Sequence, residues 1–510
     1  RPSVGPEHAR AAIASARAAR AAWAERPLED RIAAVIAGME ALGAVNEEIV
    51  PELARMMGRP VRYGGEFGGV EERIRHMASI AAETLADIEV GEDAGFRRYI
   101  RRVPHGVVFV VAPWNYPYMT AINTIAPALI AGNAVVLKHA TQTLLAGDRL
   151  AAAFHAGGVP EDVFVNLTLD HDTTLALIAE RQFDFVNFTG SVGGGQAMER
   201  AAAGTFTGVG TELGGKDPGY VMDDADLGAA VATLVDAAMY NSGQCCCGME
   251  RIYVHESQYD EFVERAVATI SDYQLGNPLD ADTTMGPMAH LRFAETVRRQ
   301  TAAAVAAGAT AHIATMDADD GGAYLTPQLL TGVTHDMEVM REESFGPVVG
   351  VMKVSGDDEA VALMNDSRYG LTASLWTPDV ERAVQNIAGA IHLAAVVGDA
   401  GTDDLHQRVT VGGTRYLLES CPENTRVVVV SSIVYYGTHL QTHTCFEDTP
   451  PGRAVGPYSR AKQAQEEVAR EKISEGANVT IVRPANVYGP GSGPWVDDAC
   501  ELLKVGMPAL

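Results

Sequence analysis

The stretch F-D-F-V-N-F-T-G-S-V-G-G-G (183–195) predicts a buried β-strand that ends in a glycine-rich turn. The next residues, Q-A-M-E-R-A-A-A (196–203), have the composition of a helix. A glycine-rich turn between a strand and a helix N-terminus lets backbone N–H groups approach a pyrophosphate. Gly190 and Gly195 lie five positions apart, which departs from the usual G-x-G-x-x-G, so an ordinary flexible turn is the alternative interpretation.

Similar strand patterns recur along the chain on both sides of this stretch. The buried-strand candidates are 106–112, 133–138, 183–188, 218–222 and 251–254. Each is followed by a helix-like stretch, which indicates an α/β fold with parallel sheets and crossover helices. Residues 1–88 are expected to be helical, with one helix ending at 58–60 and another starting near Glu71. F-R-R-Y-I-R-R-V-P (96–104) alternates like an exposed arm strand.

Length, composition and charge narrow the class of protein. The chain has 510 residues, enough for about three domains, and 47% of them are hydrophobic, as in a globular protein. Its formal net charge of −27 argues against nucleic acid and anionic membrane surfaces as partners. No apolar run reaches the roughly 18 residues of a membrane span. The absence of an initiator Met and of a leader pattern suggests a chain cut at both ends.

Three adjacent cysteines, Cys245, Cys246 and Cys247, stand in N-S-G-Q-C-C-C-G (241–248). Six cysteines in 510 residues indicate a reducing, cytoplasmic setting and no disulfide framework. A structural zinc site needs paired, spaced cysteines, so we expect no metal here. Three small buried hydrophobic residues, or one nucleophile with two neighbours, remain as interpretations of the tripeptide.

An ordered set of motifs resembles the signature of the aldehyde dehydrogenase superfamily. The set is P-W-N-Y-P (113–117), V-L-K (136–138), F-T-G-S (188–191), T-E-L-G-G-K (211–216), G-Q-C-C (243–246) and E-E-S-F-G-P-V (342–348). Glu212 and Cys246 lie 34 residues apart, as in that family. The resemblance covers residues 1 to about 391 and implies a Rossmann-like cofactor domain over 1–212 and a catalytic domain over 213–391.

The resemblance also implies a mechanism. Cys246 is the nucleophile that adds to the aldehyde, the Asn115 amide and the Cys246 backbone N–H stabilise the oxyanion, and Glu212 activates water to hydrolyse the thioester. A base of this kind needs a pKa near the working pH, so we expect Glu212 in a partly desolvated site. The identity of the aldehyde is not readable from these residues.

Cofactor residues follow from the same resemblance. Lys138 is expected to hold the adenosine ribose, Ser191 the pyrophosphate and Glu343 the nicotinamide ribose, with Phe345 packing on the ring. Thr141 replaces the glutamate that NAD-preferring relatives place three residues after the lysine, so we expect NAD with NADP tolerated. The remaining cofactor-binding candidates are Trp114, Gly190, Gly195 and Leu213.

After residue 391 the family pattern stops, and the chain resembles the extended short-chain dehydrogenases and NAD-dependent epimerases. The matching segments are 412–419, 427–437, 458–462 and 483–491. Tyr458 and Lys462 share a helix face, where the ammonium is expected to lower the phenol pKa, and Ser432 occupies the substrate-hydroxyl position. No glycine-rich cofactor turn lies between 392 and 510, so this fragment is incomplete.

Three functions follow from these motifs. The first is NAD(P)-dependent oxidation of an aldehyde to a carboxylic acid. The second is a chimera, whether natural, engineered or an assembly artefact, that only binds dinucleotide, and the third is epimerase-type chemistry at Tyr458 and Lys462. The resemblance implies a homo-oligomer, but the closing strand that would pair with the arm at 96–104 is missing. The apolar strands after 391 are expected either to complete the catalytic sheet or to form a small sheet of their own.

Overall fold

The computed structural model of the protein describes residues 2–93, 96–379, 382–383, 389–392, 407–420, 426–441, 445 and 449–483. The chain divides into two compact units. The first comprises Arg1–Leu85 and Val103–Pro378, and the second Ala86–Arg102 and Asp379–Leu510. The domain boundaries expected at 212 and 391 stay predictions.

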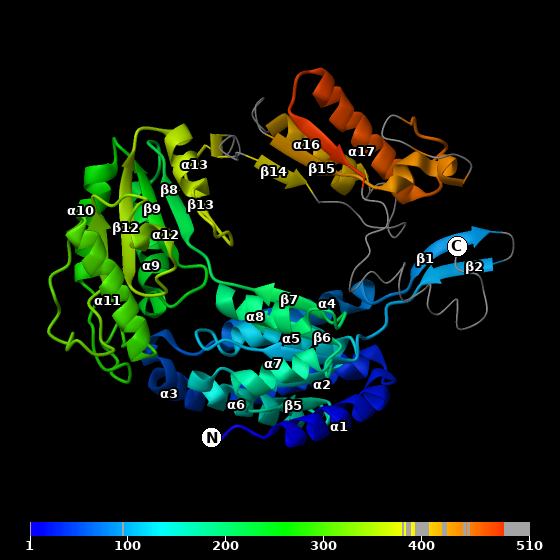
Figure 1. Ribbon diagram of the computed structural model, residues 1–510, viewed down its shortest axis with the longest axis horizontal. Helices are drawn as coiled ribbons and strands as arrows, with labels where there is room; N and C mark the ends of the chain where they lie inside the picture. The colour runs from blue at the N-terminus through cyan, green and yellow to red at the C-terminus, as the bar shows by residue number, and fades with distance from the viewer. Residues whose placement is uncertain are drawn as a thin grey trace. The chain divides into compact units, whose positions relative to one another are not determined.

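A five-stranded parallel sheet forms one half of the first unit (Figure 1), in the order β5-β4-β3-β6-β7. The strands are β3 (Val107–Val111), β4 (Ala134–Lys138), β5 (Phe164–Asn166), β6 (Phe185–Thr189) and β7 (Gly208–Glu212). Every residue of β3 and β4 is buried, as the sequence predicts for strands covered on both faces.

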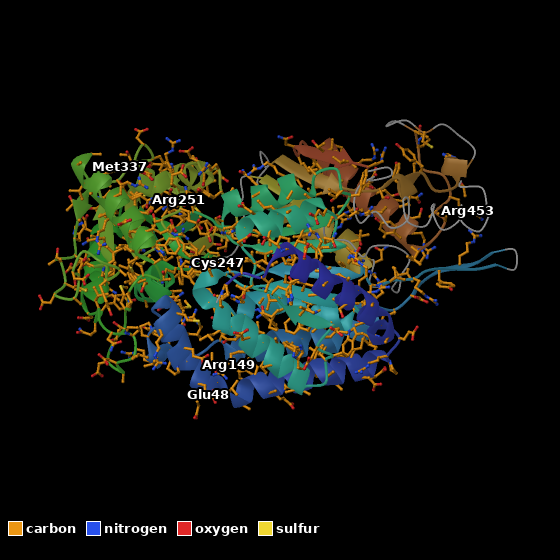
Figure 2. All side chains as sticks on the ribbon, turned by 60° about the horizontal axis from the view of Figure 1, so that its bottom comes forward. Glu48, Arg149, Cys247, Arg251, Met337 and Arg453 are labelled. Carbon is orange, nitrogen blue, oxygen red and sulfur yellow. The ribbon has the colours of Figure 1, made fainter. Side chains whose placement is uncertain are left out.

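Helices cover both faces of this sheet. They are α1 (Pro6–Ala24), α2 (Leu28–Ala44), α3 (Asn46–Met57), α4 (Phe67–Thr84), α5 (Met119–Ile130), α6 (Leu144–Ala156), α7 (His171–Ala179) and α8 (Val192–Ala202), with short 3-10 turns η1 (Val61–Tyr63) and η2 (Thr141–Thr143). Alternate residues of β3 enter two different cores: Val108 and Val110 pack with α2, α5 and α6, while Phe109 packs with α1 and α7. Arg149 on α6 forms ion pairs with Glu48 and Glu52 on α3, at 2.7 and 2.6 Å (Figure 2).

A six-stranded sheet forms the other half of the first unit, in the order β10-β11-β12-β9-β8-β13. Only β10 runs antiparallel to its neighbour. The elements are β8 (Asp217–Val221), α9 (Leu227–Met239), η3 (Tyr240–Gly243), β9 (Met249–His255), α10 (Tyr259–Ser271), α11 (Leu291–Ala306), β10 (Thr310–Ala311), β11 (Gln328–Thr331), α12 (Glu338–Arg341), β12 (Val348–Val354), α13 (Asp357–Asn365) and β13 (Ser374–Trp376). Buried Arg251 on β9 donates to the carbonyls of Lys216, Leu363 and Met364, which joins β9 to the segment before β8 and to the end of α13.

The second unit contains an antiparallel pair, β1 (Ile88–Asp93) and β2 (Phe96–Ile100). The arm strand expected over 96–104 therefore ends at Ile100. The unit also contains a parallel sheet, β14 (Gly389–His392), β15 (Arg426–Val430) and β16 (Val479–Val482), with η4 (Gln407–Gly412), α16 (Gly413–Ser420), η5 (Ile433–Gln441) and α17 (Pro457–Ser474). The apolar strand at 426–430 belongs to the small separate sheet, one of the two arrangements expected, whereas residues 393–406 of the apolar stretch after 391 lie outside the described residues. The predicted segment 483–491 lies outside the described residues beyond Arg483.

Candidate active site

A cavity of about 1050 Å³ lies in the first unit and is lined by the last residues of β3, β4, β6 and β7. Ligands of parallel α/β sheets bind at this carboxyl edge, because the strand ends leave a crevice there. Figure 2 shows Cys247 where the elements of the two sheets of this unit meet. The predicted residues in the lining are Trp114, Asn115, Lys138, Gly190, Ser191, Glu212, Leu213, Cys246, Glu343 and Phe345. Gly195 is not in the lining.

The turn that precedes the three cysteines has an unusual backbone. Asn241 and Ser242 both have φ of 56°, and Gly243 has φ of 70°. A Cβ atom on Gly243 would lie 2.3 Å from the carbonyl carbon of Gly346, so only glycine fits this contact. The buried Gln244 side chain donates to the Asn241 carbonyl at 3.0 Å and accepts from the Ala289 N–H at 2.8 Å. These contacts fix the start of the cysteine segment.

The three thiols differ in exposure and in pKa. Cys245 and Cys246 are half-buried and Cys247 is exposed, with 3.8 Å between the sulfurs of Cys246 and Cys247. The hydrogen bond with Cys246 and then burial raise the pKa of Cys245, while the Tyr116 hydroxyl lowers it less. The hydrogen bond with Cys245 lowers the pKa of Cys246, but the bond with Cys247 and burial outweigh it and raise the value to about 11. The bond with Cys246 lowers the pKa of Cys247.

Asn115 is buried, and its side-chain amide donates to the Gln244 carbonyl at 3.2 Å. The amide therefore faces the cysteine turn. The main-chain carbonyl of Asn115 accepts from Arg59 Nη2 at 2.7 Å and from the Asn241 amide at 3.3 Å. These contacts join the 113–117 loop to the turn before the cysteines.

Arg59 and Glu66 are site residues that the sequence reasoning missed. They form a buried ion pair at 2.9 Å. Glu66 also accepts from the backbone N–H groups of Tyr118 and Met119, at 3.0 and 2.8 Å. Burial is the largest influence on the Glu66 pKa and raises it against the opposing effect of Arg59. The only sequence signal for Arg59 is its place between Gly58, which ends α3 with φ of 82°, and Pro60; hydrophobic patterning gives no hint that it is buried.

Glu212 differs from the expectation in one respect. Its carboxylate lines the cavity at the end of β7, yet the residue is exposed. The partly desolvated setting expected for it is therefore not found. Asp217, five residues further along the chain, is a carboxylate whose pKa burial raises, to about 7.

The residues predicted to hold a cofactor line other parts of the same cavity. Lys138 is 5% exposed at the end of β4, and burial lowers its pKa. Within the described chain, neither a hydrogen bond nor a carboxylate partner is found for its ammonium group. Ser191 caps α8 by accepting from the Gly194 N–H at 3.2 Å. A Cβ on Gly190 would lie 2.7 Å from the Phe188 ring, so the turn lies close against that ring.

The backbone directly after Glu343 is held by a buried carboxylate, Glu250, that the sequence reasoning did not identify. Glu250 accepts from the N–H groups of Ser344 and Phe345 at 2.7 and 2.9 Å, and from Lys216 at 2.5 Å. Glu343 accepts from the Gly215 N–H at 3.2 Å. Burial and then the charge of Glu250 raise the pKa of Glu343 to about 7.

Aromatic and apolar contacts complete this part of the cavity. Trp114 stacks on Phe293 with ring centroids 5.0 Å apart and meets Phe345 edge-on at 5.6 Å. A Cβ on Gly195 would lie 2.6 Å from Leu213, so Gly195 allows α8 to pack against that side chain. Gly195 thus supports the packing of α8 behind the cavity wall and does not itself line the cavity.

The short-chain dehydrogenase residues lie in the second unit. Lys462 donates to the Val430 carbonyl and to Gln465, both at 2.9 Å, and burial lowers its pKa to about 8. Its nitrogen lies 5.6 Å from the centre of the Tyr458 ring. Burial raises the pKa of Tyr458, with Ser432 opposing it through a hydrogen bond. The expected lowering of the phenol pKa by Lys462 is therefore wrong, because burial dominates and the ammonium is turned toward other acceptors.

The described ranges contain neither a metal-binding cluster nor a membrane-spanning helix. In these ranges, His, Cys, Asp and Glu side chains form no group of three or more that could hold a metal ion. Nor does any helix there have the length and apolarity to cross a membrane.

Comparisons with known proteins match both parts of the chain. A sequence profile of the Aldehyde dehydrogenase family matches residues 2–416. A profile of the NAD dependent epimerase/dehydratase family matches residues 367–498. The two matches therefore share residues 367–416.

Individual relatives agree with the first match. An aldehyde dehydrogenase of Paenarthrobacter nicotinovorans is 34% identical over 385 residues, 74% of this chain and 84% of the relative. The NADP(+) succinate-semialdehyde dehydrogenase 1 of Mycobacterium tuberculosis is 36% identical over 310 residues, 60% of this chain and 67% of the relative. A crystal structure of an NAD-dependent aldehyde dehydrogenase from Sinorhizobium meliloti matches with a TM-score of 0.72 at 33% identity, covering 76% of this chain and 78% of that one. The chain belongs to the aldehyde dehydrogenase family, with a C-terminal segment similar to the NAD-dependent epimerases.

Proposed function

We propose that the first unit oxidises an aldehyde to a carboxylic acid through a covalent thioester on Cys246. The observation that carries this proposal is the convergence of a thiol, the Asn115 amide and the Glu212 carboxylate on one cavity. Residues separated by more than a hundred positions meet there at the carboxyl edge of a parallel sheet, where this kind of site forms.

The cofactor is NAD or NADP, as in the relatives described above. The cavity fits a dinucleotide because it presents a buried ammonium, a glycine-rich turn and the N-terminus of α8. We assign Lys138 to the adenosine ribose, Ser191 to the pyrophosphate and Glu343 to the nicotinamide ribose, with Trp114 and Phe345 beside the ring. When bound, the nicotinamide accepts the hydride that leaves the substrate carbon.

Cys246 begins the reaction. Its sulfur adds to the carbonyl carbon as a thiolate, and the carbonyl π electrons move to oxygen. The Asn115 amide and the backbone N–H of Cys246 donate to that oxyanion, which stabilises it most where water is excluded. As the C=O bond re-forms, hydride departs and a thioester remains on Cys246.

Glu212 acts in the second half. Its carboxylate removes a proton from water as the water oxygen attacks the thioester carbon. The C–S bond then breaks, the acid is released and the Cys246 thiolate returns. The exposure of Glu212 gives bulk water direct access to this base.

Two other functions receive less support. A chain that only binds dinucleotide has no need of Asn115 and a thiol in the same cavity. Epimerase-type chemistry at Tyr458 needs a phenol that ionises readily, whereas burial raises its pKa. Because some relatives are succinate-semialdehyde dehydrogenases, aldehydes that carry a carboxylate belong among the substrates to test.

The test is the absorbance of reduced nicotinamide formed from an aldehyde by the wild-type chain, Cys246→Ala and Cys247→Ala. We expect Cys246→Ala to abolish turnover and Cys247→Ala to retain at least a substantial fraction of it. Turnover that survives Cys246→Ala but not Cys247→Ala would assign the nucleophile to the exposed thiol. Turnover unaffected by both would refute the covalent mechanism, and cofactor binding without turnover in the wild type would support a binding-only chimera.

A further inference from the structure

Cys246 and Cys247 lie at the corner of a turn on the cavity wall. The Gly248 N–H donates to the Cys245 carbonyl at 3.1 Å, so Cys246 and Cys247 are the two central residues of that turn. In an extended strand, consecutive side chains point to opposite faces, but in this turn the two sulfurs lie only 3.8 Å apart. Both residues line the cavity. The proposed nucleophile therefore has a second thiol in contact with it.

The second thiol is the more accessible of the two. Cys247 is exposed, whereas Cys246 is half-buried. The hydrogen bond with Cys246 lowers the pKa of Cys247, and acylation of Cys246 removes that bond. An exposed, ordinary thiol still supplies some thiolate near neutral pH, and the thiolate is the nucleophilic form of cysteine. Once Cys246 carries an acyl group, a nucleophile is thus already beside the thioester.

The base proposed for hydrolysis is near both sulfurs. The hydrogen bond with Cys246 is the largest influence on the Cys247 pKa, but the charge of Glu212 also acts on it and raises it. Such an influence requires the Glu212 carboxylate to lie near Cys247, and both residues line the same cavity. Loss of this carboxylate is therefore expected to slow hydrolysis of a thioester at either position.

Building on the proposed function, we infer that Cys247 is a second acyl acceptor, which takes the acyl group from Cys246 by thioester exchange. The Cys247 thiolate attacks the thioester carbon, an oxyanion forms, and the C–S bond to Cys246 breaks as the carbonyl re-forms. The Cys246 thiolate is released and takes up the proton that Cys247 lost. One thioester replaces another, so no oxidant or further reactant is consumed, and contact between the sulfurs makes the step intramolecular. The exchange frees Cys246 for a second aldehyde before the first acyl group is hydrolysed.

Cys245, the third thiol, provides the matched control. It precedes the corner of the turn and is half-buried. The hydrogen bond with Cys246 and then burial raise its pKa, so it stays a neutral thiol. Replacing it removes one sulfur next to Cys246 and leaves the acceptor in place.

The test uses Glu212→Gln, in which acyl groups accumulate because hydrolysis is slowed. The full chain is mixed with NAD and either butanal or succinate semialdehyde, whichever wild type oxidises faster. It is then quenched in acid and digested with pepsin at low pH, where protonated thiols do not exchange, and the cysteine peptide is fragmented by mass spectrometry. We expect acyl groups on Cys246 and on Cys247, with a burst of about two equivalents of reduced nicotinamide per chain.

Further variants, each combined with Glu212→Gln, identify the path of the acyl group. Cys247→Ala should limit the burst to about one equivalent, whereas Cys245→Ala should keep it near about two. Cys246→Ala should abolish acylation of Cys247. An acyl group on Cys247 in the absence of Cys246 would make Cys247 a primary nucleophile and overturn the inference.

The same experiment distinguishes this inference from the reaction on which it rests. Acyl groups confined to Cys246 would overturn the exchange and leave the proposed function intact. No acyl group on any cysteine, in a folded chain that binds NAD, would refute the proposed function itself and the exchange with it.

Discussion

Arg59 Nη2 donates a hydrogen bond of 2.7 Å to the main-chain carbonyl of Asn115, and the same guanidinium contacts the Asn241 side chain at 3.3 Å. One buried side chain thus holds the loop of the proposed oxyanion donor and the turn that presents the thiols. Its charge is balanced by Glu66.

Replacing Arg59 with Met should lower both stability and kcat. Removing one partner of a buried ion pair costs about 3–5 kcal/mol, because the remaining carboxylate is left uncompensated. At temperatures where the variant is folded, we expect kcat to fall at least about tenfold with little change in the aldehyde KM, measured by steady-state kinetics beside urea unfolding.

A double variant separates the two effects of Arg59. Arg59→Met combined with Glu66→Gln leaves no unpaired buried charge and should recover part of the unfolding free energy. It should not recover kcat, because the Asn115 carbonyl still lacks the hydrogen bond from Arg59 and keeps only the longer one from the Asn241 amide. Full recovery of kcat in the double variant would mean that Arg59 acts on stability alone.

The thiols should alkylate in a pH order set by their pKa values. The pKa of Cys246 is raised to about 11, so its thiolate fraction, and its rate with iodoacetamide, should rise about tenfold for each pH unit from 7 to 10. Cys247, whose pKa is lowered, should react at lower pH. Peptide mass mapping after timed labelling of the cofactor-free protein measures both rates.

The matched variants for this experiment remove one sulfur each. Cys247→Ala removes a hydrogen bond that raises the Cys246 pKa, so labelling of Cys246 should shift to lower pH. Cys245→Ala removes one that lowers it, so the shift should be opposite. A Cys246 rate that is flat with pH in all three proteins would contradict this order.

Glu343 should make stability depend on pH. Its folded pKa of about 7 lies above the ordinary carboxyl value, so its favourable contribution is complete at low pH and is lost as the pH rises through about 7. Glu343→Gln stays neutral and should therefore gain stability relative to wild type between pH 5 and pH 8, measured by urea unfolding. A constant difference across that range would show that Glu343 titrates elsewhere.

Gly243→Ala should be severely destabilising and inactivating. The residue has a positive φ, and the new Cβ would meet the Gly346 backbone at 2.3 Å, which cannot move aside as a side chain does. Gly308→Ala is the control, since Gly308 has φ of 107° but nothing within 4 Å of an added Cβ. Thermal unfolding of both variants separates the contact from the backbone strain that they share; equal losses would mean that the contact is unimportant.

The sequence predicted the parts of the site that local chemistry marks. Runs such as V-V-F-V-V gave the buried strands because both faces of a parallel sheet are covered. Distinctive residue types also marked the loops at the strand ends. Arg59, Glu66 and Glu250 were missed because charged residues are usually exposed, and their burial depends on backbone groups brought together only by folding. The exposure of Glu212 and the partial burial of Tyr458 also depend on the folded structure and cannot be read from local sequence.

The hydrogen bonds of Glu250 bear on how the aldehyde dehydrogenase part of the chain relates to the epimerase-like part that follows it. Glu250 lies on β9 and accepts hydrogen bonds from Lys216, in the segment after Glu212, and from the backbone N–H groups that follow Glu343. The last residue to line the cavity is Leu371, and the first unit extends only to Pro378. Every contact described above among the proposed reacting groups thus involves residues that precede β14, the first strand of the small parallel sheet, so the proposed site needs no residue of that sheet.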